Sequence, residues 1–179
     1  MSDSDFSAGA PAHLDYGGLG RALLAVCKVA ALIGGLLFVG LVVMEIISIV
    51  GRKLAARPVP GDVETLQMCS AVAAASFFAF CHMNGGDVRV DFFTRNLPPS
   101  VIHALDALAS LLVGLFGALL AWRTAVGALS LREAGETSPI LDWPLWIAQM
   151  SMVPGFVLLA AAGFYRSVHE LACIRARRP

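Results

Sequence analysis

Four apolar stretches make up most of this chain, and each is about long enough to cross a lipid bilayer. They are residues 29–50, 65–83, 102–122 and 143–165, and almost all charged residues lie in the short segments outside them. An apolar helix needs roughly 20 residues to cross a hydrocarbon core of about 30 Å. The pattern therefore predicts an all-α membrane protein with four transmembrane helices.

The composition leaves little room for a soluble domain. Of the 179 residues, 58% are hydrophobic and only 15% are charged, so a soluble fold could not cover its apolar surface. A formal net charge of zero gives no support to a role in binding nucleic acid. We divide the chain into a polar N-terminal tail (1–21), a four-helix transmembrane domain (22–170) and a basic C-terminal tail (171–179). The N-terminal tail has no basic cluster before an apolar run, so we expect no cleaved signal peptide.

The distribution of Lys and Arg predicts the orientation. With four spans, both termini share one side of the membrane with the second connecting segment. That side carries Arg21, Lys28, Arg89, Arg95, Arg166, Arg175, Arg177 and Arg178, and the opposite side carries Arg52, Lys53, Arg57, Arg123 and Arg132. The excess of positive charge on the first side favours cytoplasmic termini.

Few ionisable residues fall within the spans. Glu45 lies near the end of the first span and Asp106 near the start of the third. Their positions suit interfacial carboxylates that are hydrated or paired with a neighbouring helix, because ion and proton relays usually place acids nearer the membrane centre. Neither residue by itself indicates a pump.

Histidines and cysteines allow two enzyme-like alternatives to be weighed. His82, His103 and His169 fall on the predicted cytoplasmic side, where a pair could hold haem in a membrane-anchor cytochrome subunit. The same positions equally suit amphipathic residues at the interface. The four cysteines form no C-x-x-C pair, which argues against a membrane thiol oxidoreductase.

The connecting segments are more informative than the spans. Asp62 can cap the second helix, and Glu64 lies favourably in its first turn. In the next segment, Val90, Phe93 and Leu97 share one face of a short interfacial helix that we predict at the membrane surface.

Taken in order, these segments resemble the small membrane subunit of tripartite ATP-independent periplasmic (TRAP) transporters, over roughly residues 22–166. The resemblance is carried by Arg52, Gly61-x-x-Glu64, Val88-Arg89-Val90-Asp91, Leu97-Pro98, Gly135-Glu136-Thr137-Ser138, Leu141 and Pro144-x-Trp146. The chain departs from the family at Asp87, where many relatives have His or Asn.

The resemblance implies a sodium-driven importer of an organic anion in the bacterial inner membrane. In such systems a periplasmic binding protein delivers the anion to two membrane subunits. The large subunit carries the substrate and sodium sites and moves as an elevator. The small subunit packs against the scaffold of the large one, so the resemblance implies that this chain is no enzyme and has no catalytic, cofactor or metal site.

Candidate site residues follow from the same motifs. We expect contacts with the large subunit or the binding protein from Arg52, Gly61, Glu64, Glu136, Ser138, Pro144 and Trp146, all on the predicted periplasmic side. The alternative role of these residues is helix capping and interfacial anchoring. We expect Val88, Arg89, Val90, Asp91 and Pro98 to shape the cytoplasmic turn. A haem-binding cytochrome subunit and a self-sufficient homodimeric transporter remain alternative functions, and the sequence does not indicate the substrate.

Overall fold

The computed structural model describes residues 17–55, 59–87 and 99–176. Within these residues the chain forms four long helices, α1 (Gly18–Ala55), α2 (Asp62–Met83), α3 (Pro99–Ala134) and α4 (Leu145–Ala176). Each helix is long and apolar enough to span a membrane. The predicted four-helix membrane fold is therefore confirmed, and the chain is a multi-pass membrane protein. The orientation of the termini stays a prediction.

One part of the prediction falls outside the described residues. The short interfacial helix and the residues expected to shape the same turn lie in the segment 88–98. These residues are Val88, Arg89, Val90, Asp91 and Pro98.

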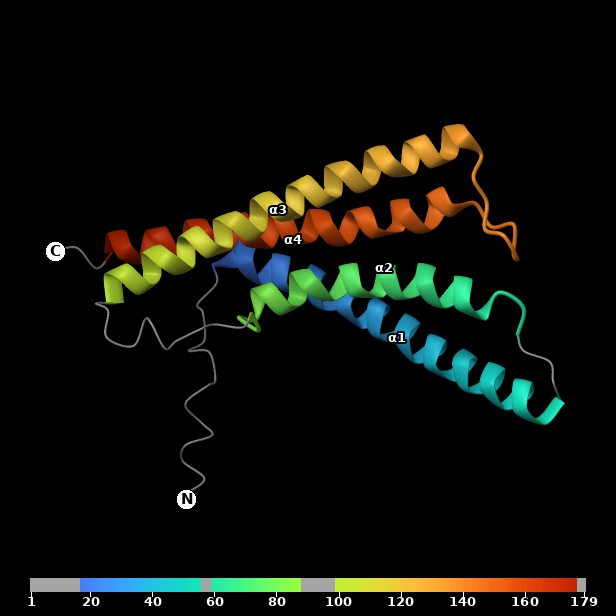
Figure 1. The fold of residues 1–179 in the computed structure, drawn as a ribbon. Helices are drawn as coiled ribbons and strands as arrows, with labels where there is room; N and C mark the ends of the chain where they lie inside the picture. The colour runs from blue at the N-terminus through green and yellow to red at the C-terminus, as the bar shows by residue number, and fades with distance from the viewer. Residues whose placement is uncertain (1–16, 56–58, 88–98, 177–179) are drawn as a thin grey trace, which may run out of the picture.

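The helices form two antiparallel hairpins, α1–α2 and α3–α4, that pack side by side through α2 and α4 (Figure 1). Among the described residues, α3 contacts only α4, and α1 touches α4 at few points. The α1–α2 and α3–α4 connections lie together at one end, which we call the loop end (Figure 1). The opposite end, where α1 and α3 begin and α2 and α4 finish, is the terminal end.

Small residues set how closely the helices pack. A Cβ atom added to Gly163 of α4 would lie 2.5 Å from the backbone nitrogen of Gly114 in α3, so the two backbones touch directly. A Cβ atom on Gly155 would lie 2.7 Å from the backbone of Ala75 in α2. Helix association in membranes depends on this close approach, since lipid is as apolar as the side chains. Ala75 and Ala79, two small residues of α2 four positions apart, are both buried.

Helix α3 is much longer than the apolar stretch that predicted it. The predicted span closes at Trp122, although the apolar pattern runs on through Arg123 to Leu131, and α3 accordingly continues to Ala134. The helix stops at Gly135, whose φ of 66° lies in the left-handed region. The amide nitrogen of Gly135 donates to the carbonyl of Arg132, and that of Glu136 donates to the carbonyl of Leu131. This Schellman motif satisfies the last carbonyls, so backbone geometry and not hydropathy ends the helix.

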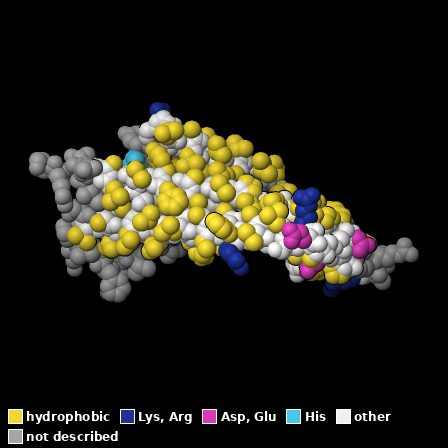
Figure 2. Space-filling model, turned by 90° about the horizontal axis from the view of Figure 1, so that it is seen from above, with side chains coloured by type: hydrophobic (Ala, Val, Ile, Leu, Met, Phe, Trp, Pro, Cys, Tyr) yellow, Lys and Arg dark blue, Asp and Glu magenta, His cyan; other side chains and the backbone are white. Residues whose placement is uncertain are grey.

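The surface between the two ends is mostly apolar. Figure 2 shows hydrophobic side chains covering the helices, with the acidic side chains of this face gathered at the loop end. Large exposed hydrophobic residues occur on every helix. Such a surface fits a chain surrounded by lipid or by other membrane helices.

Candidate partner-contact site

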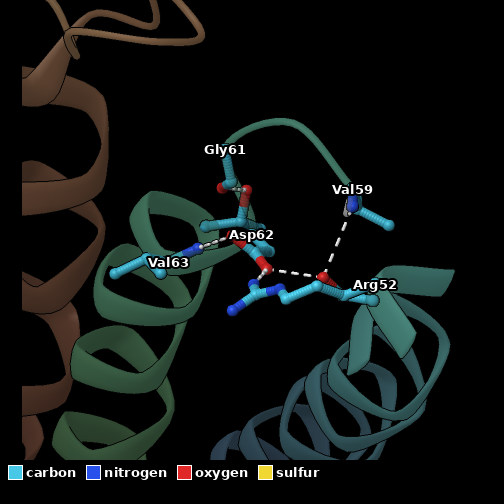
Figure 3. A network of polar contacts seen from close by, with 7 residues as sticks. Arg52, Val59, Gly61, Asp62 and Val63 are labelled. Carbon is cyan, nitrogen blue, oxygen red and sulfur yellow. Dashed lines mark hydrogen bonds and ion pairs between the residues drawn. The ribbon is translucent and has the colours of Figure 1, made fainter. Parts of the chain in front are cut away.

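The connection between α1 and α2 is held by a buried carboxylate, Asp62 (Figure 3). The Ser48 hydroxyl donates to Asp62 Oδ2 at 2.5 Å, and Arg52 Nη2 lies 2.9 Å from the same oxygen. The amide of Val63 donates to Oδ1 at 2.8 Å, and the amide of Val59 donates to the Ser48 hydroxyl at 3.3 Å. The N-cap position of α2 is Gly61, with φ 71°, and not Asp62 as predicted. Asp62 instead binds α1, because Ser48 and Arg52 face it across the turn.

Glu64 joins the two hairpins at the loop end. Its carboxylate accepts a hydrogen bond from the Ser138 hydroxyl, one from the Ile140 amide at 3.0 Å and one from the Leu141 amide at 3.2 Å. Glu64 also lies in the first turn of α2, where a negative charge is favourable. The α3–α4 loop is therefore fixed to the start of α2.

Gly61 is required at this junction for two reasons. Its positive φ favours glycine, and an added Cβ would lie 2.4 Å from Leu141 Cγ. The loop that carries Leu141 is itself compact, because the Ser138 amide donates to the Trp143 carbonyl at 2.8 Å and the Asp142 amide donates to the Ser138 carbonyl at 3.1 Å. The two loops thus fit against each other as one unit.

The remaining predicted contact residues lie around this unit. The Glu136 side chain is exposed, and its carbonyl accepts a hydrogen bond from the Leu145 amide. Pro144 forms an isolated bridge with Thr137. The Arg132 guanidinium lies 5.2 Å from the centre of the Trp146 ring, a cation–π contact. Contact of any of these residues with a partner stays a prediction.

Ser48 takes part in the hydrogen bonds around Asp62 but is not among the site residues predicted from the sequence. It lies four residues before Arg52, on the same face of α1. That spacing was the available signal. What the sequence did not show is the position of Asp62, the acceptor that both side chains share.

A second polar cluster ties α4 to the end of α2 at the terminal end. Arg166 Nη1 donates to the His82 carbonyl at 2.6 Å, and Asp87 Oδ2 lies 2.7 Å from His82 Nδ1 and 3.4 Å from Arg166 Nη1. Arg166 and His82 are only 2% and 3% exposed. A cation at the C-terminal end of a helix is favourable. The position at which the chain departs from the family motif, Asp87, thus contacts both side chains.

The other two histidines of the helices and Glu45 lie outside both of these polar clusters. His103 Nδ1 lies 2.8 Å from Glu170 Oε2, and the His169 ring stacks on Tyr165. His103 and His82 therefore each have a carboxylate partner within the chain, Glu170 for His103 and Asp87 for His82. Glu45 is half-buried, and its Oε1 has no hydrogen-bond partner among the described residues.

The network around Asp62 predicts unequal effects of two substitutions. Ser48→Ala removes a buried hydroxyl that both donates and accepts, so we expect a loss of about 1–2 kcal/mol in the free energy of unfolding. Arg52→Gln should cost less than about 1 kcal/mol, because its side chain is 58% exposed and the ion pair is screened. Unfolding of the two variants in lipid nanodiscs measures the difference. A larger effect at Arg52 would contradict the geometry described here.

Comparison with protein families gives a match that includes Asp62, Glu64 and the residues that they bind. Residues 38–173 match the family model described as tripartite ATP-independent periplasmic transporters, DctQ component. No curated protein and no solved structure matches the chain.

Proposed function

Since the chain belongs to the DctQ family of TRAP transporter components, we propose that it is the non-catalytic small membrane subunit that holds the stationary part of a secondary transporter. In this proposal the chain resides in the bacterial inner membrane and binds a large membrane subunit. A periplasmic solute-binding protein delivers an organic anion, and a sodium gradient drives its import.

The observation that best supports a scaffolding role is the attachment of α2 to the α3–α4 hairpin at both ends. At the loop end Glu64 accepts three hydrogen bonds from the α3–α4 loop. At the terminal end Arg166 donates to the last turn of α2. A subunit that stays fixed while its partner moves needs its helices held in one arrangement.

The loop end offers the surface that we assign to the binding protein. Arg52 and Glu136 have exposed side chains, and Pro144 and Trp146 are partly exposed beside them. Gly61, Glu64 and Ser138 hold the two loops together beneath this surface. In the proposal these three residues act by positioning the exposed ones.

Co-purification tests the function as a whole. The chain is tagged in its native membrane, extracted gently and analysed for bound proteins. The proposal expects a large polytopic membrane protein in stoichiometric amount. A stable dimer of this chain alone would contradict it and would favour the self-sufficient transporter.

Charge reversal tests the surface assigned to the binding protein. We expect Arg52→Glu and Glu136→Arg each to lower uptake roughly 3- to 10-fold at limiting binding protein, because charges at the rim of an interface act mainly on the association rate. The effect should shrink as salt is raised. Arg21→Glu is the matched control, since Arg21 is exposed at the terminal end. If both reversals leave uptake unchanged while the complex stays intact, the loop end does not contact the binding protein.

A further inference from the structure

The register between α3 and α4 fixes the position of Arg123 along the molecule. A Cβ atom on Gly117 would lie 2.8 Å from the backbone nitrogen of Ala160, and a Cβ atom on Gly127 would lie 2.6 Å from Gln149 Nε2. The two helices run antiparallel, and Arg123 lies between these two contacts. It is therefore level with the part of α4 between Gln149 and Ala160.

That part of α4 is the middle of its span. Residues 143–165 of α4 and the turn before it contain no charge, and Pro154 lies at their centre. The next residue, Gly155, packs against Ala75 near the middle of α2. The apolar stretches of two neighbouring helices, α4 and α2, thus have their middles level with Arg123, which is the centre of the membrane and not its edge for a bilayer centred on these two helices.

Arg123 is exposed at this depth. It lies on α3, which contacts only α4 among the described residues. Phe116, Leu119 and Val126 lie one or two turns away on the same face and are exposed as well. Across the part of the chain that the structure describes, Arg123 forms no hydrogen bond, ion pair or ring contact.

A guanidinium group in this place needs an anion. Arginine stays charged in proteins, and a charge near the bilayer centre is strongly disfavoured unless it is paired or reaches water. Snorkelling to the interface serves residues near helix ends. Arg123 is about ten residues, or about 15 Å, from either end of the span that α4 defines. Helix α1, which carries Glu45, does not contact α3.

We propose that the face of α3 around Arg123 packs against the large membrane subunit, and that Arg123 pairs there with a carboxylate of that subunit. A carboxylate accepts two parallel N–H bonds from a guanidinium, which gives strong and specific pairing away from water. This inference rests on the proposed function. It adds the surface that meets the large subunit and the chemical group that this surface requires.

Substitutions at position 123 separate pairing from packing. We expect Arg123→Gln and Arg123→Leu each to weaken association with the large subunit about 30-fold or more, because the partner carboxylate loses its counter-charge. Arg123→Lys should keep part of the affinity, since it keeps the charge without the bidentate geometry. Lys53→Gln, which removes an exposed charge at the end of α1, is the matched control and should associate like the unchanged chain.

Two further measurements make the result decisive. The isolated chain with Arg123→Leu should insert and resist unfolding at least as well as the unchanged chain, so weaker association cannot come from misfolding. A photo-crosslinking amino acid at Leu119 or Val126 should label the large subunit.

The possible outcomes separate the two proposals. If Arg123→Leu associates normally and the crosslinker labels only lipid, Arg123 faces the bilayer and this inference is wrong, while the subunit function stands. If the unchanged chain binds no large membrane protein, both proposals fail.

Discussion

Replacing Glu64 with alanine should lower the free energy of unfolding by about 3 kcal/mol and release the α3–α4 loop from α2. The substitution leaves the Ser138 hydroxyl and the amides of Ile140 and Leu141 without their acceptor. An unsatisfied buried donor costs about 1–3 kcal/mol, and Ser138 is only 1% exposed. Ile140 is exposed, so water can replace part of what its amide loses. Chemical unfolding of the purified chain in nanodiscs measures the change.

Two comparisons identify the cause of the Glu64 effect. Glu64→Gln keeps one acceptor oxygen and should lose less stability than the alanine variant. Gln67→Ala changes an exposed side chain three residues further along α2 and should be nearly neutral. If the alanine variants at 64 and 67 unfold alike, Glu64 does not hold the loops together. A Glu64→Ala chain that stays fully stable yet fails in uptake would make this residue a direct partner contact.

Replacing Gly163 with leucine should lower the free energy of unfolding by about 3 kcal/mol or more and separate α3 from α4. The first added atom would lie within 2.6 Å of the backbone nitrogen and Cα of Gly114. A backbone cannot move aside as a side chain can, and interiors packed to this density do not absorb the extra volume. A non-glycine residue gains at most about 1 kcal/mol from helix propensity, which is too little to offset the collision.

Gly35 of α1 provides the opposite result. A Cβ atom there would meet nothing within 4 Å, so Gly35→Leu should leave the isolated chain as stable as before or more stable by up to about 1 kcal/mol. Unfolding of both leucine variants in nanodiscs tests the contrast. Equal stability of the two would show that the α3–α4 contact is looser than the structure has it.

Much of the fold and part of the site could be predicted from local patterns. Apolar stretches of about 20 residues suffice for four membrane helices, because every backbone polar group must be satisfied within the segment that crosses the lipid. Glu64 was recognisable from its place in the first turn of α2. Gly61 could be identified as part of the Gly61-x-x-Glu64 motif, but its contact with Leu141 could not be predicted from the sequence.

Contacts between distant segments could not be predicted in this way. Glu64 binds Ser138, which is 74 residues away, and Asp87 meets Arg166, which is 79 residues away. The periodicity of neighbouring residues carries no information about pairs so far apart in the sequence.

The position of Arg123 along the molecule shows most clearly what the sequence determines and what the tertiary structure determines. The sequence by itself determines four apolar helices and the family to which they belong, because hydrophobic length and short motifs are local properties. On that basis Arg123 looks like the charged residue that closes the third span. The tertiary structure places it beside the middle of the apolar stretch 143–165, because direct backbone contacts at glycines such as Gly117 and Gly163 set how far α3 slides along α4. Register between helices depends on which surfaces fit, and that fit exists only once the helices are packed together.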